Sequence, residues 1–221
     1  MKKRILSLLL VILTLFPLTA LALSDHDLAI QQMQVCAFSS EYNDNGRNTL
    51  RRWEDPIKVY FSGKFTEGDV AFFHDFIRQL RDNVPDMPSV SIVNDPMEAN
   101  VNMYFVKLKE MKSVIPSYVE GNWGIFSFSV WDDVIIRADI GIAYDKCDAK
   151  ARKHLMMEEF IGMLGLANDH NLDKKSILYQ PWTTVQKLTN ADWLMLRMLY
   201  SRKVRAGMHI SEAIPIMETI Y

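Results

Sequence analysis

Three ionisable side chains lie close together in one predicted helix of the C-terminal half: His154, Glu158 and Glu159. Residues 149–166 contain no proline, and their apolar side chains recur at helical spacing, so this segment is predicted to be the strongest helix of the chain. At about 100° per residue, His154, Glu158 and Gly162 share one strip of polar or small residues. His154 and Glu158 are one turn apart, a spacing at which an imidazole and a carboxylate can bind one metal ion.

Glu159 is displaced from this strip. It lies about 140° from His154, on a side of the helix that is otherwise apolar. A buried carboxylate without a partner is costly, so Glu159 needs either a basic partner or a raised pKa. An acid of perturbed pKa beside an open polar strip is a candidate general base. The structural alternative is an ion pair with Arg197 or Arg137.

The segment 158–169 resembles the active-site helix and turn of the metzincin zinc peptidases, H-E-x-x-H-x-x-G-x-x-H. Gly165 occupies the glycine position of that motif, at which the chain turns off the helix. Downstream, residues 176–179 resemble the methionine turn, with Leu178 at the methionine position, and residues 188–200 are similar to the closing helix of matrixin-type domains. The resemblance covers about residues 56–201. It implies a metzincin-like mixed sheet with an active-site-type helix, a turn and a C-terminal helix.

The three positions of the zinc ligands are all altered. They hold Glu158, Gly162 and Asn168, whereas the general-base position keeps Glu159. A catalytic zinc ion takes three protein ligands and leaves one position for water. Because Gly162 offers no side chain, the usual zinc site cannot assemble.

The pattern is closer to an exported bacterial family, domain of unknown function 2927 (DUF2927). Its members resemble metzincins in which glutamate, glutamine and asparagine stand at the ligand positions, and no activity is established for them. Gly162 departs from the glutamine that is usual there. The residues that match the family pattern are Glu158, Glu159, Leu164, Gly165, Leu166, Asn168, Asp169, Ser176, Leu188, Thr189, Asp192, Leu199, Tyr200, Gly207 and Met208.

A different set of metal ligands is conceivable. His154 and Glu158 could share a zinc ion with His170 or Asp169 as the third ligand. Pairs of histidine and glutamate at this spacing are, however, also common on solvated helix faces, and residues 168–170 are equally typical of a turn that ends a helix. No G-x-S-x-G motif indicates serine catalysis.

The composition describes a globular chain and excludes several other classes. Of the 221 residues, 49% are hydrophobic and 24% charged, which excludes an intrinsically disordered chain and a collagen-like repeat. The formal net charge is −2 and no run of lysine or arginine occurs after residue 4, so nothing supports binding to nucleic acid.

The N-terminus predicts export. Lys2, Lys3 and Arg4 precede an apolar stretch, and an Ala-Leu-Ala sequence at residues 20–22 suits a signal peptidase. We expect a signal peptide at 1–22 that is removed, which leaves a periplasmic or secreted protein with a net charge of −5. The only membrane contact expected is through this signal before cleavage. An uncleaved anchor is the alternative, since residues 5–23 are uncharged and nearly long enough to span a bilayer.

The predicted export also bears on the two cysteines, Cys36 and Cys147. In an oxidising compartment an even number of cysteines usually forms disulfides. We therefore predict a Cys36–Cys147 disulfide, with two buried thiols as the alternative.

The remaining periodicity predicts an α/β domain. Strands are expected at 57–61, 90–93, 99–106, 121–130 and 135–144, and helices at 70–84, 149–166 and from Thr189 onward, where Thr189 and Asp192 form a capping box. An N-terminal arm at 23–55, helical around 27–33, precedes a metzincin-like domain at 56–221.

Two functions, and a third option of a structural envelope component whose cleft is merely filled, are compatible with these residues. The first is an exported, non-catalytic module that binds a protein or peptide in the former active-site cleft, lined by Glu158, Gly162, Asn168 and Asp169, without a cofactor. The second is a metal-dependent peptidase in which Glu159 is the general base.

Overall fold

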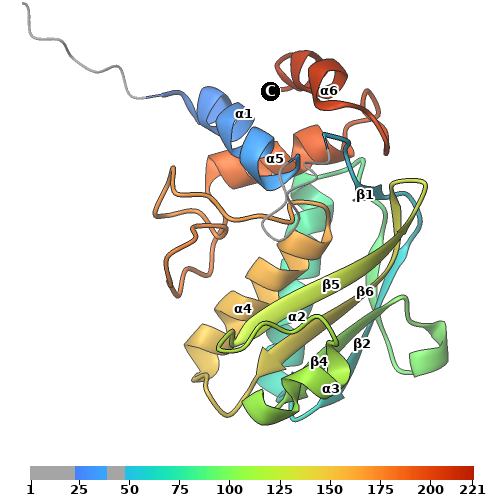
Figure 1. Ribbon diagram of the computed structural model, residues 1–221, viewed down its shortest axis with the longest axis vertical. Helices are drawn as coiled ribbons and strands as arrows, with labels where there is room; N and C mark the ends of the chain where they lie inside the picture. Colours follow the sequence, from blue (N-terminus) through green and yellow to red (C-terminus); the bar gives the residue numbers. More distant parts are fainter. Residues whose placement is uncertain (1–22, 39–47) are drawn as a thin grey trace, which may run out of the picture.

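The computed structural model describes residues 23–38 and 48–221. The expected signal peptide at 1–22 lies outside the described residues. Within them, the mixed α/β class predicted from the sequence is confirmed: a twisted sheet has two long helices on one face, and further helices gather at one end (Figure 1). The helices are α1 (Asp25–Cys36), α2 (Glu67–Asn83), α3 (Met111–Val114), α4 (Ala149–Met163), α5 (Asn190–Tyr200) and α6 (Ile210–Met217), with short 3-10 turns η1 (Pro96–Glu98) and η2 (Leu108–Glu110).

Six strands form one sheet in the described part of the chain. They are β1 (Arg52–Trp53), β2 (Ile57–Gly63), β3 (Val90–Val93), β4 (Val101–Val106), β5 (Gly124–Trp131) and β6 (Val134–Ala143). The parallel strands run in the order β3, β2, β4, β6, and β1 pairs with the start of β6. β5 pairs antiparallel with the other edge of β6. The sheet is therefore mixed, with one antiparallel strand at its margin.

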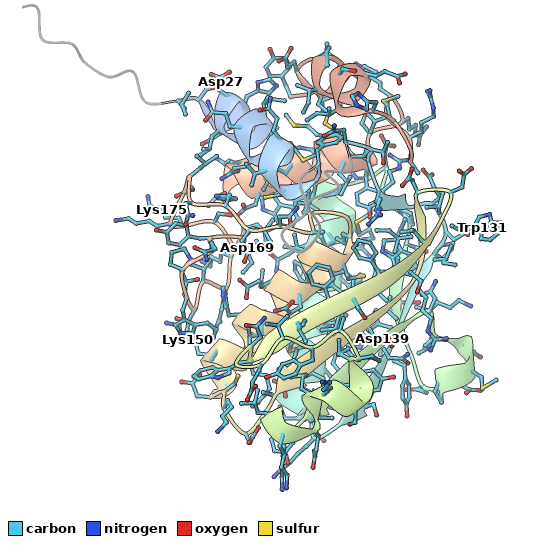
Figure 2. The ribbon with its side chains drawn as sticks, viewed as in Figure 1. Asp27, Trp131, Asp139, Lys150, Asp169 and Lys175 are labelled. Atoms are coloured by element: carbon cyan, nitrogen blue, oxygen red, sulfur yellow. The ribbon has the colours of Figure 1, made fainter. Side chains whose placement is uncertain are left out.

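A tight hairpin joins β5 to β6. Asp132 and Asp133 have φ angles of 51° and 62°, the left-handed conformation that two-residue hairpin turns require. Trp131, at the end of β5, is 77% exposed and projects from the body (Figure 2). The turn thus places β5 directly beside β6 over its full length.

Helices α2 and α4 cover one face of the sheet. Along β4, Val101, Met103 and Phe105 point into the main core beneath these helices, as the two-residue period of a strand predicts. α2 begins with a complete capping box of Thr66 and Asp69, one turn earlier than the periodicity alone predicts. A small second cluster around Met111 lies on the opposite face.

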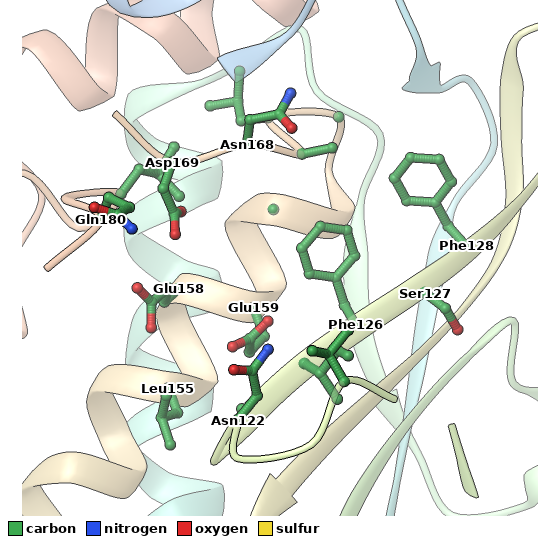
Figure 3. Close-up of a pocket in the computed structure, with 18 of the residues that line it drawn as sticks. Asn122, Phe126, Ser127, Phe128, Leu155, Glu158, Glu159, Asn168, Asp169 and Gln180 are labelled. Atoms are coloured by element: carbon green, nitrogen blue, oxygen red, sulfur yellow. The ribbon is translucent and has the colours of Figure 1, made fainter. Parts of the chain in front are cut away.

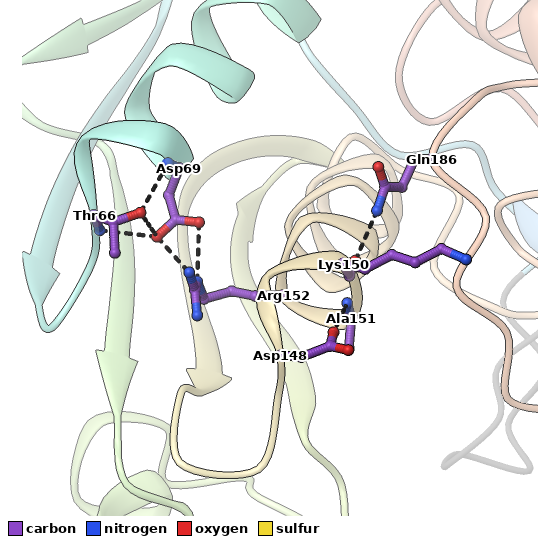
Figure 4. Close-up of polar contacts among 7 residues, drawn as sticks. All are labelled: Thr66, Asp69, Asp148, Lys150, Ala151, Arg152 and Gln186. Carbon is purple, nitrogen blue, oxygen red and sulfur yellow. Dashed lines mark hydrogen bonds and ion pairs between the residues drawn. The ribbon is translucent and has the colours of Figure 1, made fainter.

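The N-terminal half of α4 is held by polar contacts to its neighbours (Figure 4). Asp148 caps the helix by accepting from the Ala151 N–H at 2.7 Å. Arg152 donates through Nε to both carboxylate oxygens of the buried Asp69 at 2.9 Å. Asp69 therefore links the start of α2 to α4, and so orients the helix that carries the glutamates.

The C-terminal end of α4 is satisfied by two buried aromatic side chains. Trp53 donates from Nε1 to the Met163 carbonyl at 3.0 Å, and Tyr200 donates its hydroxyl to the Leu164 carbonyl at 2.8 Å. These bonds replace partners that the last carbonyls of a helix lack. Gly165 then turns the chain with φ +121°, and its Cα lies so close to the Arg51 carbonyl that a side chain would collide. The sharp turn predicted at Gly165 is confirmed.

The N-terminal arm is integrated into the fold through α1. Ala29, Met33 and Cys36 are fully buried, and α1 packs on α5 and α6. These three helices lie together at one end of the molecule (Figure 1). The capping box of Thr189 and Asp192 at the start of α5 is present as predicted. No helix among residues 23–38 and 48–221 is long and apolar enough to cross a membrane.

The predicted disulfide is wrong. Cys36 and Cys147 are both free thiols. The Cys36 carbonyl accepts from the Asn168 N–H, beyond the C-terminal end of α4, whereas Cys147 precedes its first residue. The 15 residues of α4 separate these two places by about 22 Å, far beyond the roughly 7 Å between Cα atoms that a disulfide tolerates.

Candidate functional site

The glutamates of α4 face a deep cleft between this helix, β5 and the segment that follows α4. Its volume is about 1010 Å³, the size of a site for a large ligand. Glu158, Glu159, Gly162, Asn168 and Asp169, all predicted from the sequence to line one site, lie in its wall. Figure 3 shows Glu158 and Glu159 on α4 and Asp169 opposite, with its carboxyl group directed toward the helix.

One wall of the cleft is the outer edge of β5. β6 occupies the inner edge, and no strand of the described residues pairs with the outer one. The Trp123 carbonyl accepts from the Ala143 N–H on the inner side. Because the direction of backbone groups alternates along a strand, the N–H and C=O groups of Gly124, Phe126 and Phe128 point outward, into the cleft.

Glu159 lies at the bottom of the cleft, against the start of β5. It is 9% exposed, and its Oε1 is so close to Gly124 that a Cβ atom there would collide with it. Within residues 23–38 and 48–221 it makes no hydrogen bond or ion pair, so neither Arg197 nor Arg137 is its partner. Burial, and then the charges of Glu158 and Asp169, raise the pKa of Glu159 well above its ordinary value. Of the two alternatives that the sequence left open for this buried acid, the structure has the raised pKa and not the ion pair with Arg197 or Arg137.

Glu158 is less deeply placed, and it contacts His154. Its Oε2 lies 3.4 Å from His154 Nε2. The His154 Nδ1–H donates to the Val185 carbonyl at 2.6 Å, which leaves Nε2 as an acceptor. Burial, with the charge of Asp169, raises the pKa of Glu158 to about 8, and burial lowers the pKa of His154. The hydrogen-bond partner of Nε2 is the Thr183 hydroxyl, at 3.5 Å, and the Glu158 carboxyl group lies beside it.

Asn168 joins the cleft to α1. Its side-chain Nδ2 donates to the Val35 carbonyl at 3.3 Å, and its backbone N–H donates to the Cys36 carbonyl at 3.2 Å. The amide thus tethers the turn after α4 to the end of α1. Asp169, the next residue, is half-buried in the cleft wall.

Gly162 is in contact with an aromatic ring. A Cβ atom at this position would collide with Cε1 of Phe126, so the ring fills the space that a side chain would need. In the metzincin-like pattern, Gly162 stands at the second ligand position. The ring of Phe126 therefore occupies the space that a side chain at position 162 would need.

His170 has a structural role outside the cleft lining. Ser176 donates its hydroxyl proton to Asp192 at 2.6 Å, so His170 Nε2, at 3.1 Å from Ser176 Oγ, must be the donor to that oxygen. Nδ1 of His170 accepts from the Leu172 N–H at 3.1 Å. Burial lowers the pKa of His170 to about 4. Both ring nitrogens are engaged, and the histidine, serine and aspartate brace the loop on α5.

The alternative metal site is not assembled. In the described ranges, no group of three histidine, cysteine, aspartate or glutamate side chains is placed to hold a metal ion. His154 and His170 each use both ring nitrogens in contacts with the chain. Together with Gly162, this arrangement does not fit the zinc ion that the metzincin resemblance implies.

The aromatic residues on one side of the cleft were not predicted from the sequence. Phe126 and Phe128 come from β5, while Trp123 and Trp182 form an edge-to-face pair with ring centroids 5.3 Å apart. The alternation of aromatic residues in 124–131 was a usable signal. Trp182 carried none, because it lies in a loop of 26 residues between α4 and α5.

The chain matches a family profile described as "Protein of unknown function (DUF2927)" over residues 28–219. The chain belongs to this family. The match extends from α1 to the residues after α6, so the DUF2927 domain includes the helical end as well as the sheet and the cleft. A comparison with curated proteins found no match. The function of this DUF2927 domain has therefore to be argued from its site.

Proposed function

We propose that this DUF2927 protein is exported and that it binds an extended peptide, without cleaving it, in the cleft between β5 and α4. The observation that carries the proposal is the unpaired outer edge of β5, which forms one wall of a large cleft. An exposed strand edge otherwise invites aggregation, and a segment that adds to it as a further strand satisfies its backbone groups.

The dimensions suit a short peptide. Residues 124–128 extend over about 17 Å, at roughly 3.4 Å per residue, which is enough for about five residues of an added strand. The backbone groups of Gly124, Phe126 and Phe128 supply the hydrogen bonds. The aromatic and acidic side chains opposite them supply pockets for alternate side chains of the peptide.

The absence of catalysis is argued from the positions at which a metzincin would hold zinc. Gly162 lacks a side chain and is covered by the ring of Phe126, and Asn168 is turned toward the end of α1. Glu159 has the position of a general base, but burial and then the charges of Glu158 and Asp169 raise its pKa well above the ordinary value, which disfavours the ionised form that a base needs. A metzincin-like scaffold whose cleft binds a peptide but does not cleave it accounts for these features. Export rests on the basic residues, apolar stretch and Ala-Leu-Ala sequence of residues 1–22.

The test is binding and hydrolysis by the purified protein with one set of acetylated, amidated hexapeptides. Binding is followed by the tryptophan fluorescence, to which Trp123 and Trp182 of the cleft contribute, and hydrolysis by mass spectrometry. We expect saturable binding without cleavage. N-methylation of alternate amides of a bound peptide should abolish binding in one register and leave it intact in the other, because only one set of amides meets β5.

Two results would overturn the proposal. The first is the failure of any hexapeptide to bind. The second is stoichiometric zinc in the purified protein, together with peptide hydrolysis that Glu159→Gln abolishes while the fold is retained; this would establish the metal-dependent peptidase instead.

A further inference from the structure

We propose that the acidic end of the cleft binds a positively charged side chain of the peptide, the ammonium group of lysine or the guanidinium group of arginine. The inference rests on the proposed function, because it names the class of side chain that the peptide presents to α4. Glu159, Glu158 and Asp169 form this end of the cleft.

Glu159 is a buried acid without a partner in the described part of the protein. Its side chain is nine-tenths buried, lines the cavity and makes no hydrogen bond or ion pair within the described part of the protein. A buried carboxyl group without a partner costs free energy that a partner from outside would recover. Its position against Gly124 places that partner between α4 and the edge of β5, where a bound strand would run.

The charged groups around Glu159 are mainly acidic. Glu158 and Asp169 both act on it, and their effect is repulsive, since each raises its pKa. His154, the neighbour of Glu158, is held neutral by burial. Arg51, a basic residue in the cleft lining, lies against the ring of Phe128 and beside Asp133. A cation at the acidic end would stabilise the ionised carboxylates, which gives the site charge complementarity to a basic side chain.

Two tryptophan side chains, Trp123 and Trp182, line the cleft as well. Trp123 and Trp182 are 39% and 55% exposed, form an edge-to-face pair and line the cleft near the carboxylates. The faces of tryptophan rings attract ammonium and guanidinium groups, and the methylene stem of lysine or arginine packs on apolar surface while its charged end reaches a polar partner. Carboxyl groups at the bottom and indole rings at the mouth match both parts of such a side chain.

The arrangement of the acidic side chains in the cleft favours an organic cation over a metal ion. No three acidic or histidine side chains of residues 23–38 and 48–221 converge on a point at metal-binding distances. A guanidinium group presents five N–H donors over a wide plane and can contact carboxylates that are spread along a wall. The acids of the cleft are spread in this way, two on α4 and one on the segment after it.

The experiment uses a positional-scanning set of acetylated, amidated hexapeptides. Each position in turn carries lysine, arginine, norleucine, citrulline or glutamate, and binding is measured at pH 7. We expect lysine or arginine at one position to bind at least tenfold tighter than norleucine or citrulline. Glu159→Gln and Glu158→Gln should each reduce this preference to less than threefold. Glu98→Gln, which removes an exposed acid of η1 outside the cleft, should leave it unchanged.

A second readout separates a cation from a neutral ligand. Glu158, whose pKa is raised to about 8, holds a proton at pH 7, and the pKa of Glu159 is raised as well; a bound cation favours the ionised forms, so on the order of one proton should be released to the buffer. Calorimetry in two buffers of different ionisation enthalpy measures this number. The norleucine peptide should release none.

The outcomes distinguish this inference from the proposed function. Equal affinities for lysine and norleucine peptides, without proton release, would overturn the inference and leave peptide binding in place. Failure of every peptide to bind would overturn both. Tight binding of Ca²⁺ or Zn²⁺ that Glu159→Gln abolishes would assign the carboxylates to a metal ion, and would also overturn the inference.

Discussion

The carboxyl group of Glu158 should lower the stability of the protein at alkaline pH. Its folded-state pKa is raised to about 8 from 4.5, by burial and by the charge of Asp169. The folded state therefore binds this proton more tightly than the unfolded state. The stability that the proton contributes is complete below pH 4.5 and is lost as the pH rises through 8.

The magnitude follows from the pKa difference. At 1.36 kcal/mol per pKa unit, the difference between 4.5 and about 8 sets an upper bound of about 5 kcal/mol. The Glu158 side chain is 19% exposed, so solvent screening reduces the expected effect to roughly 2–3 kcal/mol. Glu158→Gln preserves the shape of the side chain and carries no ionisable group. The variant should match the wild-type protein at pH 5 and exceed it by roughly 2–3 kcal/mol at pH 8.5.

Urea unfolding at the two pH values measures this difference. Glu98→Gln is the matched control, since it removes the same charge from an exposed position and should show the wild-type dependence on pH. The free energy of unfolding of the double variant Glu158→Gln, Glu159→Gln should depend on pH even less, because the pKa of Glu159 is raised as well. A Glu158→Gln variant that is no more stable than the wild type at pH 8.5 would refute the electrostatic description of the cleft.

Three further predictions concern the scaffold around the cleft. Ser176→Ala should lower the free energy of unfolding by about 1–3 kcal/mol, because it leaves a buried carboxylate, Asp192, without its 2.6 Å donor; a loss below 0.5 kcal/mol in urea unfolding would contradict this. Gly165→Ala should cost more than about 2 kcal/mol, since φ is +121° and the Arg51 carbonyl blocks the Cβ position; an unchanged midpoint would count against that backbone contact. In the native protein Cys147, half-buried, should react with a thiol reagent faster than the buried Cys36, and the intact mass should not rise by 2 Da on reduction.

Local signals predicted much of the scaffold. The capping box of Thr189 and Asp192 and the strand at residues 90–93 are at the expected positions, because caps and two-residue alternation are encoded by neighbouring residues. The helical period also predicted that Glu159 is buried. Each of these features depends on side chains within one or two turns of each other.

Features that depend on distant segments were not predictable in this way. Trp53 and Tyr200 bind the last carbonyls of α4 from 110 and 36 residues away. The contact between Gly124 and Glu159 likewise depends on how β5 packs on the helix. The disulfide prediction failed for the same reason: compartment and cysteine number do not show that Cys36, at the end of α1, packs beyond the C-terminal end of α4, whereas Cys147 precedes its first residue.

The acids of the cleft lie inside the part of the chain that matches the DUF2927 profile. The DUF2927 match spans α1 to α6, and the cleft is bounded by elements from the middle of that range. Buried carboxyl groups with raised pKa reduce stability, and such costs are commonly retained where a site needs them. This supports a binding role for Glu158 and Glu159 over a structural one.

Hydrogen exchange of the β5 amides tests the central claim most directly. In the free protein the amides of Ile125 and Ser127, which face β6, should be protected, whereas those of Gly124, Phe126 and Phe128 should exchange faster. Addition of a binding hexapeptide should slow exchange at Gly124, Phe126 and Phe128. Unchanged exchange at these three amides, with the peptide bound, would contradict strand addition in the cleft.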